Sequence, residues 1–194
     1  EISQKRGFCL QQLKRYDEAI EQYENADLQH PNNLWNLTHL AQCCNYADQP
    51  EKAVQYYLKA EGISPDDLNL QLQTGNCLAK LGQYDEAFKR FFKVHYLDEK
   101  STTVWRAIAW YSLMAGKMEQ AGRFYQMIED NGGGDNASDL LNIGHMHWIK
   151  QDFSKATKYY KKCYQLAGED SFCEMLLSDA DSLLLMNVPP MDVP

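Results

Sequence analysis

Apolar residues recur along the chain in short stripes with the spacing of amphipathic helices, and the stripes come in pairs. In residues 34–67 the first stripe consists of Leu37, Leu40, Ala41 and Cys44, and the second of Ala53, Tyr56, Tyr57 and Ala60. Pro50 lies between the stripes, where a helix can begin because the first turn does not need the missing N–H. Gly62 and Pro65 follow the second stripe and are typical of a helix end. This segment therefore predicts two consecutive helices joined by a short turn.

The same pattern returns along the whole chain in four columns of related residues that share one register. The columns are small residues at Gly7, Ala41, Gly75, Ala109 and Gly144; alanines at Ala19, Ala53, Ala87, Ala121 and Ala156; aromatics at Tyr23, Tyr57, Phe91, Tyr125 and Tyr160; and Ala26, Ala60, Val94, Ile128 and Cys163. Successive members are 34, 34, 34 and 35 residues apart. A fixed period is typical of stacked helix pairs, because one pair cannot bury both of its faces. We expect Gly75 to face Ala87 and the aromatic residues to fill the space between repeats.

A 34-residue unit with these columns, and with prolines at Pro31 and Pro65, resembles the tetratricopeptide repeat (TPR) family. The resemblance implies an all-α fold, a right-handed α-solenoid of about five helix-turn-helix repeats plus a C-terminal capping helix. The expected parts of this single array, 1–187, are repeats at about 1–33, 34–67, 68–101, 102–136 and 137–170, and a capping helix at 171–187. An extended Pro-rich tail is expected at 188–194.

Three segments fall outside the regular pattern. The glycine-rich loop at 131–135 is predicted to be a hinge or a neutral insertion, since glycine allows backbone freedom there. The apolar run at 183–186 predicts burial against the fifth repeat, a self-association surface, or further protein beyond it. Glu1 falls inside a predicted helix, so helical material is expected before it.

Charge and apolar stretches argue against some classes of partner, and cysteine spacing bears on the compartment. The chain has 19 Lys and Arg against 27 Asp and Glu, a net charge of −8, without a basic cluster, which argues against nucleic acid. The apolar stretches are shorter than the roughly 18 residues that a membrane span needs. Cys9, Cys43 and Cys77 are 34 residues apart, which predicts one repeated packing position. All six cysteines, with Cys44, Cys163 and Cys173, are predicted to be buried, reduced thiols rather than disulfides or metal ligands. Reduced thiols favour the cytoplasm, although the compartment stays open.

Motifs that would indicate catalysis are missing from the sequence. There is no phosphate-binding loop, nucleophile elbow or HExxH motif. His145 and His147 are two residues apart and so point to different sides of a helix, which does not suit a shared metal ion. We therefore expect a protein without enzymatic activity, and without a cofactor or metal.

The resemblance implies that the first helix of each repeat lines a concave groove. Helical spacing then predicts a peptide-binding set of Trp35, His39, Gln42, Asn45, Asn69, Gln73, Asn76, Arg106, Trp110, Asn142, His145 and Trp148. Apart from Glu1, we expect no acidic residue in this groove. Asn and Gln can pair with the backbone amides of an extended peptide, and Trp and Arg often dominate binding energy. The alternative is that Trp35, Trp110 and Trp148 only pack between repeats.

These observations predict a scaffold that holds a peptide segment of a partner protein of unknown identity. One alternative is a regulatory or substrate-recognition arm of a larger multidomain enzyme, or of a secretion or assembly complex. Another alternative is a structural scaffold that forms homo-oligomers through its C-terminal helix.

Overall fold

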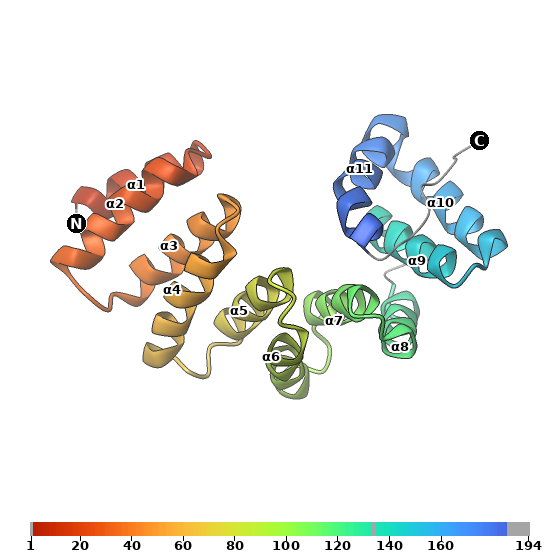
Figure 1. Cartoon of the computed structure of the whole chain (residues 1–194), viewed down its shortest axis with the longest axis horizontal. Helices are drawn as coiled ribbons and strands as arrows, with labels where there is room; N and C mark the ends of the chain where they lie inside the picture. The colour runs from red at the N-terminus through yellow and green to blue at the C-terminus, as the bar shows by residue number, and fades with distance from the viewer. Residues whose placement is uncertain (1, 133–134, 186–194) are drawn as a thin grey trace. The chain divides into compact units, whose positions relative to one another are not determined.

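The computed structural model describes residues 2–132 and 135–185, and in these residues the chain consists of helices without any strand (Figure 1). The helices are α1 (Ile2–Gln12), α2 (Tyr16–Gln29), α3 (Leu34–Tyr46), α4 (Pro50–Ile63), α5 (Leu68–Lys80), α6 (Tyr84–Leu97), α7 (Thr102–Met114), α8 (Met118–Asp130), α9 (Ala137–Ile149), α10 (Phe153–Ala167) and α11 (Glu169–Leu185). Each odd-numbered helix from α1 to α9 packs against the helix that follows it. The predicted all-α fold of helix pairs is thus confirmed.

The chain divides into two compact units, Glu1–Glu99 and Lys100–Pro194. The first unit contains α1 to α6 and the second contains α7 to α11. The boundary therefore lies before the glycine-rich loop at 131–135, of which residues 133–134 lie outside the described residues. The single array across 1–187 stays a prediction. The expected tail at 188–194 and the last two residues of the expected capping helix are also outside the described residues.

The first helices begin where a repeated polar column precedes them. Asn33 accepts a hydrogen bond from the N–H of Asn36, and Asp67 accepts one each from the N–H groups of Asn69 and Leu70. Asn136 caps α9 in the same way, whereas Ser101 at the start of α7 makes no side-chain capping bond. Such caps satisfy N–H groups that the first turn leaves unpaired, which explains why α3, α5 and α9 begin at these positions.

In the first unit, the core lies between successive helix pairs. Tyr23, Leu37, Leu40 and Tyr57 are fully buried members of one apolar cluster. The side chain of Asn36, also fully buried, donates a 2.9 Å hydrogen bond from Nδ2 to the backbone oxygen of Tyr23. Because a buried amide is costly without partners, this bond helps to fix how α2 meets α3.

The small-residue column faces the aromatic column of its own repeat. A Cβ atom added to Gly75 would lie 2.5 Å from Cε1 of Phe91, and one added to Gly7 would lie 3.0 Å from the ring of Tyr23. The expectation that Gly75 faces Ala87 stays a prediction, and the atoms nearest to this glycine belong to the ring of Phe91, one helical turn after Ala87 on α6. Gly144 has the same relationship to Tyr160.

All six cysteines are reduced, but they differ in burial. Cys43, Cys44, Cys77 and Cys163 are buried, whereas Cys9 and Cys173 are exposed. Burial raises the pKa of the Cys43 thiol to about 12 and that of Cys44 and Cys77 to about 11. The expectation of burial is wrong for Cys9 and Cys173. In the case of Cys9, no described helix covers this face of α1 as α2 covers α3 and α4 covers α5.

In the second unit, α11 packs on the last helix pair. Phe172 joins Leu140, Leu141 and Cys163 in an apolar cluster. α11 begins at Glu169, two residues before the expected capping helix. In the apolar run at 183–186, Leu183 is buried and Leu184 is exposed. The run is therefore only partly used for packing in the described residues.

Candidate functional site

An aromatic group lies on the first helices of the first unit. Phe8 on α1 and Trp35 on α3 are 40% and 44% exposed, although both are large apolar side chains. Their ring centroids are 6.1 Å apart, and Trp35 lies 4.0 Å from the ring of His39, one helical turn further along α3. The group thus presents two aromatic side chains to solvent from neighbouring first helices.

Gln11 connects this aromatic group to the polar residues beside it. Its Oε1 accepts a 2.9 Å hydrogen bond from the hydroxyl of Tyr23 and lies 3.0 Å from Nδ1 of His39. Its Nε2 donates to Oε1 of Gln42 over 3.3 Å. Burial lowers the pKa of His39. Gln11 is not among the predicted residues, although it follows Phe8 by one helical turn and so lies on the same face.

The remaining predicted residues of the first unit lie on α3 and α5. Oδ1 of Asn45 accepts a 2.8 Å hydrogen bond from Nζ of Lys80. Asn69 is exposed in the first turn of α5, and its backbone N–H bonds to the capping Asp67. Gln73 and Asn76 are half-buried one and two turns later. These amides leave polar surface on one face of α5.

In the second unit, Arg106 is held by an acidic partner. Its Nε and Nη2 each donate a 2.8 Å hydrogen bond to one carboxylate oxygen of Asp139, which is 1% exposed. The pair joins α7 to α9, and the hydrogen bonds that Arg106 donates to this carboxylate raise the pKa of Arg106. The predicted binding residue Arg106 thus has a structural partner inside the chain.

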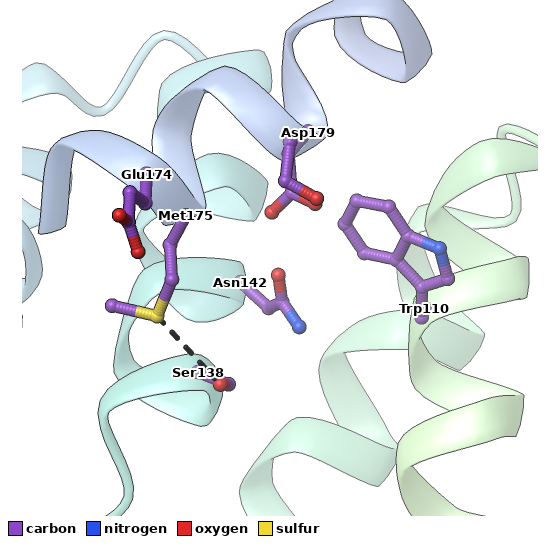
Figure 2. Close-up of a pocket in the computed structure, with 7 residues that line it drawn as sticks. Trp110, Ser138, Asn142, Glu174, Met175 and Asp179 are labelled. Atoms are coloured by element: carbon purple, nitrogen blue, oxygen red, sulfur yellow. Dashed lines mark hydrogen bonds between the residues drawn. The ribbon is translucent and has the colours of Figure 1, made fainter. Parts of the chain in front are cut away.

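A pocket of about 410 Å³ lies beside this ion pair, with walls from α7, α9 and α11 (Figure 2). It is lined by Trp110, Ser138, Asn142, Glu174, Met175, Ser178 and Asp179. Two of the predicted residues, Trp110 and Asn142, therefore meet at one site. The indole of Trp110 and the carboxylate of Asp179 point toward the same space (Figure 2). The expectation of a groove without acidic residues is wrong, because α11 contributes Glu174 and Asp179.

The contribution of α11 does not follow from the repeat period. Residues 171–187 are expected to be a cap, and the predicted groove draws only on the first helices that recur with the period. The sequence offers one signal for this contribution: residues 171–187 take the place of the first helix of a sixth repeat. Residues one and two turns apart on such a helix share a face.

His145 and Trp148 are used for packing. His145 is completely buried, with Nδ1 3.0 Å from the hydroxyl of Tyr160 and Nε2 3.4 Å from Oδ2 of Asp179. Trp148 packs against Phe153 with ring centroids 4.8 Å apart, and its Nε1 is buried. Trp148 thus packs within its own repeat rather than between repeats, and His145 does not belong to an exposed groove surface.

The described residues support neither a metal site nor a membrane-spanning helix. Across 2–132 and 135–185 there is no group of three or more His, Cys, Asp and Glu side chains placed to bind a metal ion. Among the described helices, none has both the length and the apolar character that crossing a membrane requires.

Comparison with known proteins gives the same repeat in sequence and in structure. The tetratricopeptide repeat family model matches residues 1–32, 36–67 and 140–170. Tetratricopeptide repeat protein 8 from Caenorhabditis elegans is 24% identical over 148 residues, which cover 76% of this chain. The chain spans 29% of the length of that relative.

Solved structures share the fold at low sequence identity. A tetratricopeptide repeat protein from Parabacteroides merdae has a TM-score of 0.79 and 16% identity, with 98% of this chain and 78% of that chain covered. YrrB, described as a TPR protein with an unusual peptide-binding site, has a TM-score of 0.66 and 16% identity, with 92% and 90% covered. The matches of the family model at three repeats and of the curated relative support the assignment of this chain to the tetratricopeptide repeat family.

Proposed function

We propose that this protein is a non-enzymatic interaction module whose first helices bind an extended segment of a partner protein. The binding surfaces are the face of α1, α3 and α5 in the first unit and the face of α7, α9 and α11 in the second. The TPR fold supports a scaffold of this kind, and YrrB, a protein of similar fold, has a peptide-binding site.

The pocket of the second unit is the observation that carries this proposal. It joins an indole, an amide and two carboxylates from three helices at a site that the chain's own side chains leave open. Binding sites typically combine apolar walls with a few polar groups that orient the ligand. A segment lying across α7, α9 and α11 would bury one of its side chains there.

The first unit provides a second surface of suitable chemistry. The exposed rings of Phe8 and Trp35 supply rigid apolar area, which costs little conformational entropy when a ligand binds. Gln42, Gln73 and Asn76 lie on α3 and α5 and carry both donors and acceptors for a peptide backbone. Aromatic anchors beside amides suit an extended peptide better than a flat protein surface.

Selection from a displayed random-peptide library tests the proposal. We would immobilise wild-type protein, Trp110→Ala, Trp35→Ala and the control Tyr96→Ala, which removes an aromatic side chain that is 81% exposed on the second helix α6. Arg106 is left intact, because its removal would strand the buried Asp139. Circular dichroism would verify that each variant is folded.

We expect peptides selected on wild type to bind Trp110→Ala or Trp35→Ala at least about tenfold more weakly, and Tyr96→Ala equally well. Equal binding to all four proteins would move the site away from the first helices. Failure to select any peptide would contradict the proposal itself.

Self-association is a second candidate function, favoured by one feature of α11. Leu177 and Leu184 are 75% and 56% exposed and lie two helical turns apart on the same face. Such a stripe suits a second copy of α11. Light scattering of wild type and of Leu177→Asp would test it: a dimer only in wild type supports this function, and a monomer at all concentrations excludes it.

A further inference from the structure

We propose that the pocket formed by α7, α9 and α11 accepts an arginine side chain, with its guanidinium group stacked on Trp110 and paired with Asp179. This inference deepens the proposed function, on which it rests, by naming the chemistry of one side chain in the bound segment.

The charge of the pocket favours a cation. Glu174 and Asp179 line it, and no Lys, Arg or His is among its lining residues in the described part of the chain. α11 carries five acidic residues, Glu169, Asp170, Glu174, Asp179 and Asp181, and no basic one. Arg106, the basic residue of α7, already uses its Nε and Nη2 donors on Asp139. The carboxylates of the pocket are therefore not neutralised by a lining residue.

The buried polar contacts of Tyr160 and His145 end near Asp179, where one polar atom lacks a hydrogen-bond partner within the described residues. Tyr160 and His145 are in hydrogen-bonding contact through Nδ1, and His145 is fully buried. Its Nε2 makes no hydrogen bond within the described residues and lies 3.4 Å from Oδ2 of Asp179. Buried polar atoms without a partner are rare in folded proteins and call for an explanation. A cation bound to Asp179 would fix this carboxylate beside the imidazole and complete the network.

The geometry favours arginine over lysine. In Figure 2 the indole of Trp110 and the carboxylate of Asp179 lie next to each other at the pocket, and the amide of Asn142 lies below them. A planar guanidinium can stack on an aromatic face and donate two parallel hydrogen bonds to a carboxylate, whereas an ammonium group cannot do both as well. The amide oxygen of Asn142 offers a third acceptor. A pocket of about 410 Å³ has room for one long side chain.

A small probe separates this inference from peptide binding in general. N-acetyl-arginine methylamide would be titrated into isotope-labelled protein while the indole N–H signal of Trp110 is followed by NMR. Trp110 is one of four tryptophans, so Trp110→Phe would assign its signal. The citrulline and lysine methylamides are the matched probes, because citrulline keeps the shape of arginine without the charge and lysine keeps the charge without the plane.

We expect a saturable shift of the Trp110 signal with the arginine probe and at least about tenfold weaker binding of both other probes. Asp179→Asn should weaken arginine binding by about tenfold or more. The control Asp181→Asn changes the same charge on the same helix, at an exposed position outside the pocket, and should change binding less than about twofold.

Three results would overturn the inference: no saturable shift, equal binding of citrulline, or equal effects of the two Asn variants. Suppose that the library peptides need Trp110 for binding, contain no arginine and bind Asp179→Asn as tightly as wild type. The proposed function would then stand, and the arginine pocket would be rejected. A pocket that binds the arginine probe in a protein that selects no peptide would confirm the pocket chemistry and reject the proposed function.

Discussion

Phe91 lies so close to Gly75 that a methyl group on this α-carbon would be 2.5 Å from Cε1 of the ring. The ring is completely buried, so it cannot turn out into solvent to make room. Glycine is therefore required at this position of the column because an aromatic side chain from the second helix of the same repeat approaches so closely.

Replacing Gly75 by alanine should lower the free energy of unfolding by about 1–2 kcal/mol, because the cost of overpacking exceeds the gain in helix propensity. Gly62→Ala is the matched control, since it makes the same change in α4 with nothing within 4 Å of the new methyl group. We expect this control to be neutral or to stabilise by up to about 1 kcal/mol. Urea unfolding measures both, and equal effects would contradict the interpretation.

Tyrosines of the aromatic column should respond differently to loss of the hydroxyl group. The hydroxyl of Tyr57 is buried and has no hydrogen-bond partner within the described residues, whereas that of Tyr160 contacts Nδ1 of His145 at 3.0 Å. Tyr57→Phe should be neutral or stabilise by up to about 1 kcal/mol, and Tyr160→Phe should destabilise by about 1–2 kcal/mol. Phe91 shows that the column accepts phenylalanine. Thermal unfolding of the two variants tests this prediction. A Tyr57→Phe protein that is less stable than Tyr160→Phe would contradict it.

Arg106→Gln should destabilise the second unit. The substitution leaves Asp139, which is 1% exposed, without its charged partner, and we expect a loss of about 2 kcal/mol after allowing for the partial exposure of Arg106. Arg15→Gln is the control, because Arg15 pairs with Glu18 on an exposed surface. Its unfolding midpoint should not change. A stable Arg106→Gln protein would show that the ion pair contributes little.

Thiol labelling should divide the six cysteines into two classes. Cys9 and Cys173 are exposed and should react quickly with a disulfide reagent, whereas the four buried thiols should react only on unfolding. A Cys9→Ser, Cys173→Ser protein should thus show no fast phase. Fast labelling of more than two thiols would contradict the structure.

Stability should decline in alkaline solution. Burial raises the pKa of Cys43 to about 12 and of Cys77 to about 11 in the folded protein. An unfolded thiol ionises near about pH 8.5, so raising the pH above this value favours the unfolded state until the folded thiols ionise too. We expect the free energy of unfolding to fall between about pH 8.5 and 11. A Cys43→Ala, Cys77→Ala protein should show a shallower decline, and an unchanged slope would exclude these thiols as the cause.

Much of the fold followed from the spacing of residues. The helices α3, α5, α7 and α9 begin at Leu34, Leu68, Thr102 and Ala137, with the spacing of the period, since each repeat has to bury the same face against the next. The burial of Cys43 and Cys77 came from the same period. Cys9 departs from it because a repeated residue is buried only where a neighbouring helix covers it.

The sequence by itself thus determined the helix pairs and predicted a face on each first helix, because these depend on contacts that recur with the period. Only the tertiary structure decided which side chains on those faces have partners within the chain. Arg106 pairs with Asp139 and His145 lies buried beside Asp179, through contacts across helices that no local pattern encodes. The acidic wall of the pocket comes from α11, which has no counterpart elsewhere in the described chain, so its role depends on packing alone.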